Sequence, residues 1–344
     1  MARAKEIDGL DCEASATVGV KLLLQSRLAE MCGLREGALN WSDIEGVHDM
    51  RVASRRLRSA LRDFKPFLKQ RKYRQSSEAI KRIADALGTV RDKDVAIAAL
   101  EKLAASAPPD VAPGIEQFAE DRRLVRARDR IALVDAVADD RILSLREDID
   151  TVLEAASVTM HEGKQRPGDE RVEVTFRAAG HLIVKARIEE LRQFSTSLYQ
   201  PHATKPLHRM RISTKRLRYA IELFGQCWDT QIESFSKEVA EMQTSLGELH
   251  DCDVWMAEFG GLLRNQNVKQ AVIDAAEEVD TDTQKRHSSV WLLGHFTKKR
   301  TNHYRDALAR WHDWESSDFF ARLETCIQRL PPGVVLLRAG SVGS

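Results

Sequence analysis

The sequence has few cysteines and prolines and no excess of one charge. Its five cysteines are scattered, odd in number and never spaced as CxxC, which argues against a disulfide framework or a zinc knuckle. We therefore expect reduced cysteines in a cytoplasmic protein. Lysine and arginine together number 53 and aspartate and glutamate 52, so no global positive field would attract nucleic acid. Any polyanion site has to come from local clustering of charge.

Long apolar runs are also absent. No stretch approaches the roughly 18 apolar residues of a membrane span, and residues 1–11 lack the apolar core of a signal peptide, so we expect no membrane partner. The nine prolines include bunches near residues 108–113 and 331–332, and no clear run alternates apolar and polar residues as a strand would. Between the bunches, segments rich in Ala, Leu, Arg and Glu have helical spacing, which predicts an all-α fold.

An internal repeat organises the chain. Residues 47–61 read VHDMRVASRRLRSAL and residues 207–221 read LHRMRISTKRLRYAI, so 160 positions separate His48 from His208. The same offset relates Arg27 to Arg187, and an offset of 159 relates LGTVRDKDV, from residue 87, to LGELHDCDV, from residue 246. Ordered matches at nearly one offset indicate a duplication. We predict two pseudo-symmetric four-helix bundles, over residues 12–160 and 174–312, with a linker at 161–173 and a C-terminal helix and tail at 313–344.

The expected helices follow from the apolar periodicity and from helix-start signals. A capping box formed by Ser42 and Glu45 predicts the start of the first repeated helix. Thr204 is expected to cap the second, with Pro206 in its first turn. The predicted helices cover residues 12–36, 42–68, 73–105, 114–138, 139–158, 171–199, 204–224, 231–264, 268–312 and 316–328.

A stripe of positive charge runs along each repeated helix. At about 100° per residue, the basic residues share one side of the first helix and its apolar residues gather on the opposite side. The first stripe consists of His48, Arg51, Arg55, Arg58 and Arg62. The second consists of His208, Arg211, Lys215 and Arg218, and has Glu222 where the first has Arg62.

The stripes need a counter-charge, because like charges at this spacing repel by some tenths of a kcal/mol per pair. Acidic side chains of neighbouring helices or a bound anion could supply it; a solvated basic face is the plainer interpretation. The planar guanidinium of arginine can donate two hydrogen bonds to phosphate oxygens at once. Histidine adds a further hydrogen-bond donor, whose charge changes near neutral pH. Recurrence of the pattern favours an anion site, to which we also assign Arg27 and Arg187 on the preceding helices.

Several neighbouring residues allow two interpretations. The pairs Asp92/Asp94 and Asp251/Asp253 could bind metal, but no His or Cys cluster has ligand spacing around them. We expect them to accept hydrogen bonds from the arginines, and we predict no metal site and no cofactor. Gly88 and Gly247 are expected to allow close helix approach. Arg56 and Arg216 are as well placed to make ion pairs as to bind a ligand. The basic runs at residues 122–130 and 298–300 either extend the basic surface or form solvated helix faces.

These motifs resemble those of the CHAD domain, the conserved-histidine α-helical domain, over about residues 12–312. The likeness is to a stand-alone member, since no strand pattern indicates an adjoining triphosphate tunnel domain. The resemblance implies two four-helix bundles around a basic central surface, binding of inorganic polyphosphate, a cytoplasmic location at polyphosphate granules and no established catalytic activity. Polyphosphate-metabolising proteins are further possible partners. Lys215 replaces an arginine-type position and His250 stands where the first half has Arg91, so the halves could contribute unequally.

Non-catalytic polyphosphate binding is the leading hypothesis. The alternative is a phosphohydrolase or phosphotransfer accessory protein that uses His48 or His208 as acid, base or phospho-acceptor, but no Walker A motif or activated nucleophile accompanies them. Specific nucleic-acid binding is not expected, because Tyr219 is the lone aromatic ring within the repeated motifs. Metal chelation is weakly supported, since each motif has a single histidine.

Overall fold

The computed structural model describes residues 7–68, 70–154, 159–161, 171–228, 230–270 and 279–328. These residues are almost entirely helical, as the periodicity predicts. No helix among them is long and apolar enough to cross a membrane. The first half contains α1 (Ala16–Gly33), α2 (Arg35–Leu39), α3 (Ile44–Asp63), the 3₁₀ turn η1 (Lys65–Phe67), α4 (Gln70–Ala104), α5 (Ala112–Ala136) and α6 (Asp139–Glu154).

The second half begins after a short hairpin that the sequence did not predict. Strands β1 (Thr159–His161) and β2 (Arg171–Glu173) pair antiparallel at the two ends of the expected linker, whose residues 162–170 lie outside the described part. The second half then contains α7 (Phe176–Arg192), η2 (Ser195–Tyr199), α8 (Thr204–Phe224), η3 (Gly225–Cys227), α9 (Gln231–Gln270), α10 (Val279–Ser316) and α11 (Phe319–Gln328).

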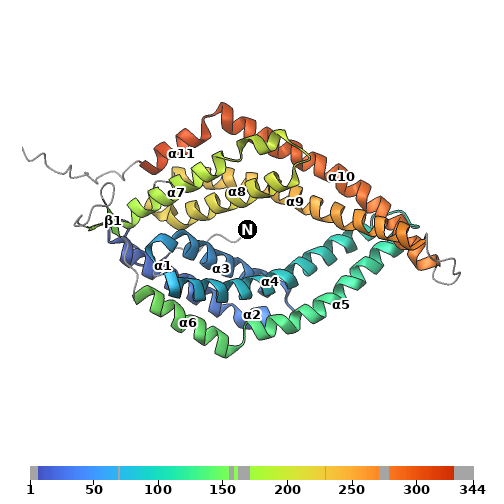
Figure 1. The fold of residues 1–344 in the computed structure, drawn as a ribbon, viewed down its shortest axis with the longest axis horizontal. Helices are drawn as coiled ribbons and strands as arrows, with labels where there is room; N and C mark the ends of the chain where they lie inside the picture. Colours follow the sequence, from blue (N-terminus) through green and yellow to red (C-terminus); the bar gives the residue numbers. More distant parts are fainter. Residues whose placement is uncertain are drawn as a thin grey trace, which may run out of the picture.

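The two stripe-bearing helices, α3 and α8, contact each other at the centre of the molecule. Helices α1 and α4 pack on α3, while α7 and α9 pack on α8. Helix α5 lies along the outer side of α4 and α10 along the outer side of α9, and α5 and α10 meet at one tip of the elongated molecule (Figure 1). The order of contacts is therefore the same in both halves.

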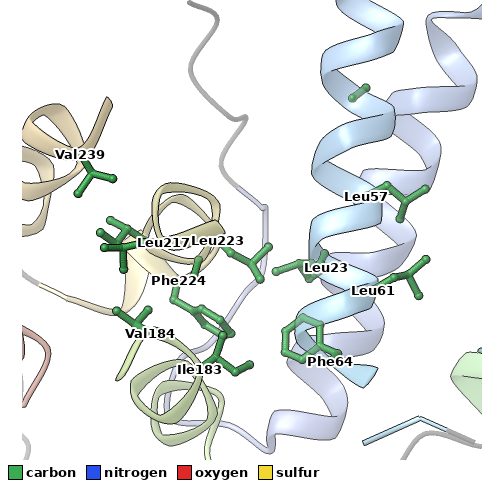
Figure 2. Packing of buried hydrophobic residues seen from close by; sticks show 14 of the residues in the cluster. Leu23, Leu57, Leu61, Phe64, Ile183, Val184, Leu217, Leu223, Phe224 and Val239 are labelled. Atoms are coloured by element: carbon green, nitrogen blue, oxygen red, sulfur yellow. The ribbon is translucent and has the colours of Figure 1, made fainter. Parts of the chain in front are cut away.

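One large hydrophobic core joins the halves. Phe64, directly after α3, lies with its ring centre 5.7 Å from that of Phe224 and 6.4 Å from that of Phe176. Leu57 and Leu61 precede it on α3 (Figure 2). Gly19 leaves room for this packing, because a Cβ there would approach the Phe176 ring to 2.4 Å. A second, smaller core joins α4 and α5 to α9 and α10; its aromatic residues include Phe118, Phe259 and Phe296.

The helix starts differ from the predicted caps. Asp43, and not Ser42, caps α3: its carboxylate accepts a hydrogen bond from the Glu45 N–H at 2.9 Å. The Ser42 hydroxyl instead donates to Asn40 at 2.6 Å. A carboxylate is the stronger acceptor and also interacts with the helix dipole, which explains the preference. The Thr204 cap is wrong as well, since Thr204 is already helical and no side chain caps α8.

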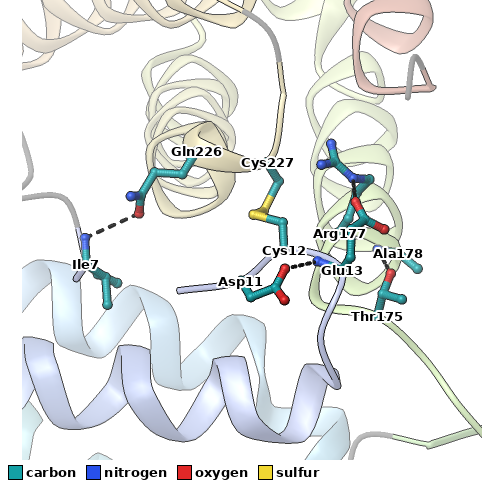
Figure 3. Close-up of a disulfide and its surroundings, with 9 residues drawn as sticks. All are labelled: Ile7, Asp11, Cys12, Glu13, Thr175, Arg177, Ala178, Gln226 and Cys227. Carbon is teal, nitrogen blue, oxygen red and sulfur yellow. Dashed lines mark hydrogen bonds and ion pairs between the residues drawn. A yellow bond between two sulfur atoms is a disulfide. The ribbon is translucent and has the colours of Figure 1, made fainter. Parts of the chain in front are cut away.

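A disulfide joins Cys12 to Cys227, contrary to the expectation that all cysteines are reduced. Their Cα atoms lie 5.4 Å apart although 215 positions separate them, so local spacing rules had no signal to detect. The N-terminal segment lies against the start of α7, where the Arg177 guanidinium donates to Glu13 (Figure 3). The backbone N–H of Arg177 also donates to the Cys12 carbonyl at 2.9 Å. The other three cysteines, Cys32, Cys252 and Cys326, are free and buried.

Removing this cross-link should destabilise the fold. Replacing Cys12 and Cys227 together by serine is expected to lower the free energy of unfolding by about 2–4 kcal/mol, because the unfolded chain regains the freedom of a long closed loop. Chemical denaturation with and without reductant measures the effect. The reductant should not shift the midpoint of the double variant. An unchanged midpoint for the natural chain after reduction would show that the cross-link does not stabilise the fold.

Candidate functional site

The basic stripes of α3 and α8 converge on one point. The guanidinium carbon of Arg55 lies 5.9 Å from the ring centre of Tyr219, and the ammonium of Lys215 lies 5.9 Å from the same ring. Burial lowers the pKa of Lys215 to about 6, and the positive charges of Arg55 and further arginines from both stripes act in the same direction. The two stripes therefore form a single cationic centre.

A cavity of about 170 Å³ opens at this centre. It is lined by Arg55, Arg211, Lys215, Gln243, Thr244, Gly247, Glu248 and Asp251. Among the described residues, no carboxylate lies within 4.0 Å of the charged nitrogens of Arg55, Arg211 or Lys215, and the Nε of Arg55 is buried without a hydrogen-bond partner. Two guanidiniums and the Lys215 amine thus lie on the cavity wall without a direct carboxylate contact, and an anion could make that contact instead.

The other stripe arginines do have acidic partners. They form the pairs Arg51–Asp92 at 2.9 Å, Arg58–Asp85 at 3.7 Å, Arg62–Asp63 at 3.5 Å and Arg218–Glu222 at 2.7 Å. The Arg51–Asp92 and Arg58–Asp85 pairs are partly exposed and therefore contribute little to stability. An incoming polyanion could replace their carboxylates at low cost.

Arg27 and Arg187 do not line the cavity. Arg27 is buried and lies 3.0 Å from Glu30, which also pairs with Arg56 at 3.3 Å. The second half repeats this triad at an offset of 160, in Arg187, Glu190 and Arg216. A ligand would have to compete with these internal carboxylates for either arginine. The triads also show that Arg56 and Arg216 make ion pairs, which was one of the two expected roles.

The histidines stand beside the cationic centre. The Nδ1 atoms of His208 and His250 are 3.3 Å apart. Burial, followed by the charges of Arg211 and His208, lowers the pKa of His250 to about 4, and burial also lowers the pKa of His208. The pKa of His48 is lowered by burial and then by Arg91, the residue at the position of His250. These imidazoles are therefore mostly neutral hydrogen-bonding groups at neutral pH.

Three of the four motif aspartates accept hydrogen bonds from arginines, but only Asp92 accepts from an arginine of the stripes, as predicted. In addition to the Arg51–Asp92 contact, Asp94 accepts from Arg126 at 2.8 Å and Asp253 accepts from Arg300 at 2.5 Å. Arg126 and Arg300 of the outer basic runs are thus engaged in the structure. No group of three or more His, Cys, Asp or Glu within the described ranges could hold a metal ion.

The predicted role of Gly88 and Gly247 in close helix approach is wrong. A Cβ at Gly88 would lie 3.7 Å from Nε of Arg51, and one at Gly247 would lie 3.9 Å from Nε of Arg211. These are ordinary contact distances, and the neighbour is a guanidinium instead of another helix backbone. The glycines border the space that the two arginines occupy.

Gln243 and Thr244 line the cavity but were missed by the sequence reasoning. At the offset of 159, their counterparts on α4 are Ala84 and Asp85, so the repeat gave no signal for a shared polar function. Both are uncharged and lie outside the stripes, where no residue pattern distinguishes them from other helix positions.

A family model and a solved structure name the same family. The family model described as CHAD domain matches residues 22–260. Two uncharacterised proteins of Mycobacterium tuberculosis, from strains H37Rv and CDC 1551, are each 27% identical over 230 residues, which cover 66% of this chain and 42% of the relative. The match thus spans less than half the length of these curated relatives.

Two solved structures share the fold. The CHAD domain from the plant Ricinus communis aligns with a TM-score of 0.67 and 21% identity, over 90% of this chain and 96% of the other. PptA from Streptomyces chartreusis aligns with a TM-score of 0.59 and 13% identity, over 87% of this chain and all of the other. Since the family model covers more than half of the sequence, the chain belongs to the CHAD domain family.

Proposed function

We propose that this protein binds inorganic polyphosphate and does not catalyse its turnover. The observation that supports this most strongly is the cavity at which Arg55, Arg211 and Lys215 meet without carboxylate partners among the described residues. Phosphate oxygens match the donors of arginine and lysine in charge and geometry. Arg51 and Arg58, whose partly exposed ion pairs a polyanion could replace, extend this surface so that it could hold a chain of several phosphates.

We further propose that the site arose by duplication of one four-helix bundle. The repeated triads, Arg27–Glu30–Arg56 and Arg187–Glu190–Arg216, support this together with the matched motifs on α3 and α8. A pseudo-two-fold relation would place the two stripes on opposite sides of one chain of phosphates. Each half would then contribute cations to the same ligand, with Glu222 in place of Arg62 weakening the share of the second half.

The proposed setting is the cytoplasm at polyphosphate granules, with polyphosphate-metabolising proteins as possible neighbours. The family resemblance is the support for this; reduced cysteines do not support it, because Cys12 and Cys227 form a disulfide. Specific nucleic-acid recognition is less compatible with the site. The described cavity is lined by no aromatic ring on which a base could stack, and base stacking is the usual contribution of single-strand binders.

Titration calorimetry with long-chain polyphosphate at two salt concentrations tests the proposal. Affinity should fall steeply as salt rises, because each phosphate neutralised by the protein releases condensed counterions. RNA at equal phosphate concentration should compete poorly, and no orthophosphate should appear when divalent metals are added. Equal competition by RNA would favour nucleic-acid binding, whereas release of orthophosphate would favour the phosphohydrolase alternative.

A further inference from the structure

The cavity is not symmetric between the two halves. It lies on the side of α9, where Gln243 and Thr244 form part of its wall. On α4, the counterpart of Thr244 is Asp85, which pairs with Arg58 at 3.7 Å. The first half thus has a carboxylate, Asp85, at the position where the second half has the uncharged Thr244. The anion site is concentrated on one side of the pseudo-symmetric centre.

The carboxylates of the cavity wall are partly compensated. Glu248 lies 3.3 Å from the ammonium of Lys299, so part of its charge is balanced from α10. Burial raises the pKa of Asp251; the charge of Arg211 acts against this shift, and the nearby carboxylates of Glu248 and Asp92 add to it. A carboxyl group with a raised pKa is more readily protonated, and in that form it donates a hydrogen bond to a phosphate oxygen.

The donor set fits a terminal phosphoryl group better than an internal one. An internal unit of a polyphosphate has two non-bridging oxygens and one charge. A terminal unit has three such oxygens and, like a phosphate monoester, about −1.5 to −2 charges at neutral pH. Arg55, Arg211 and Lys215 supply three cations, and the side chains of Gln243 and Thr244 add uncharged polar groups. One terminal group could use all of them.

We propose that the cavity beside α9 captures the terminal phosphoryl group of a polyphosphate chain, so that the protein binds the chain by its end. This inference rests on the proposed function. It predicts a preference for substrates with free ends over cyclic metaphosphates, and it assigns Gln243 and Thr244 as residues that select the chain end.

Binding stoichiometry tests the proposal on the natural chain. Calorimetry with a short linear polyphosphate and with a much longer one should give the same limit of two proteins per chain. A number of bound proteins that grows in proportion to chain length would overturn end capture while leaving polyphosphate binding intact. No binding of either polymer would overturn the proposed function and this inference together.

Variants and small competitors provide a second, independent test. Replacing Gln243 by leucine and Thr244 by valine should weaken binding of linear tripolyphosphate about tenfold. This is the usual effect of losing one hydrogen bond to a charged group, here donated by the Gln243 amide, since the Thr244 hydroxyl donates to the Ala240 carbonyl in the free protein. Thr89→Val is the matched control: Thr89 lies on α4 and, like Thr244, donates to the carbonyl four residues earlier at 2.9 Å. It should leave binding unchanged.

The competitors separate a chain end from free phosphate. Cyclic trimetaphosphate should compete weakly with the long polymer, and linear tripolyphosphate strongly. Orthophosphate that competes as well as tripolyphosphate at equal concentration would assign the cavity to free phosphate and overturn end capture. Equal affinities of the double variant and the natural chain for tripolyphosphate would also contradict it.

Discussion

Binding of polyphosphate at neutral pH is expected to take up close to one proton per protein. Lys215 has a pKa lowered to about 6 in the free protein, so most molecules hold it neutral at neutral pH. A phosphate group beside it favours the charged form and raises its pKa in the complex. The ligand therefore binds together with a proton.

The sign of the pH dependence follows from these two pKa values. Below about pH 6, Lys215 is already charged in the free protein, and its contribution to affinity is complete. As pH rises from there to the higher pKa of the complex, affinity should fall by up to about tenfold per pH unit. The histidines do not add charge in this range, because the pKa values of His48, His208 and His250 are lowered.

Calorimetry in two buffers of different ionisation enthalpy measures the proton uptake. Lys215→Arg is the control, since a guanidinium keeps its charge at all these pH values. This variant should bind polyphosphate without the proton uptake of Lys215 and with a flatter pH profile. The same uptake in the natural chain and in the variant would show that another group takes the proton.

Replacing Asp63 by leucine is expected to lower the free energy of unfolding by about 3 kcal/mol, the cost of breaking a buried ion pair. Asp63 is 3% exposed and accepts from Arg187 of the other half, at 3.2 Å from Nε and 2.8 Å from Nη2. Leucine fits the local pattern, because Leu223 occupies the position one repeat later. The loss comes mainly from leaving Arg187 without one of its two carboxylate partners, and the partly exposed Arg62 loses its Asp63 partner as well.

A second substitution distinguishes this cause from poor packing. Arg187→Met combined with Asp63→Leu removes both charges, and replacing a buried pair by apolar residues is often close to neutral. Chemical denaturation should therefore find the double variant more stable than Asp63→Leu alone. Additive losses would mean that packing, and not the unpaired charge, sets the cost.

Much of the fold could be predicted because its helices are long and periodic. The predicted helix at 204–224 coincides with α8, and those at 114–138 and 139–158 agree closely with α5 and α6. The disulfide could not be predicted in the same way, because Cys12 and Cys227 meet only through tertiary packing. The β1–β2 hairpin was also missed, since strands of three residues are too short to show alternation.

The candidate site shows both the strength and the limit of the repeat. Apolar periodicity identified the stripes, and α3 and α8 do bring Arg55, Arg211 and Lys215 together. Repetition alone cannot separate a residue kept for the ligand from one kept for the fold, however. Arg27 and Arg187 recur at the offset of 160, and the structure shows them in internal triads with glutamates. The uncharged cavity residues Gln243 and Thr244 have no uncharged polar counterparts in the first half, so the repeat could not identify them.

The most direct test of the account is calorimetry with long-chain polyphosphate on two matched variants. One carries Arg51→Ala, Arg55→Ala, Arg211→Ala and Lys215→Ala. The control carries Lys81→Ala, Lys102→Ala, Lys185→Ala and Lys237→Ala, which remove four exposed lysines outside the stripes. Both lose four basic residues, and circular dichroism verifies their helices. We predict that the first variant loses salt-sensitive binding and the control retains it; equal binding by both would contradict the assignment of the site.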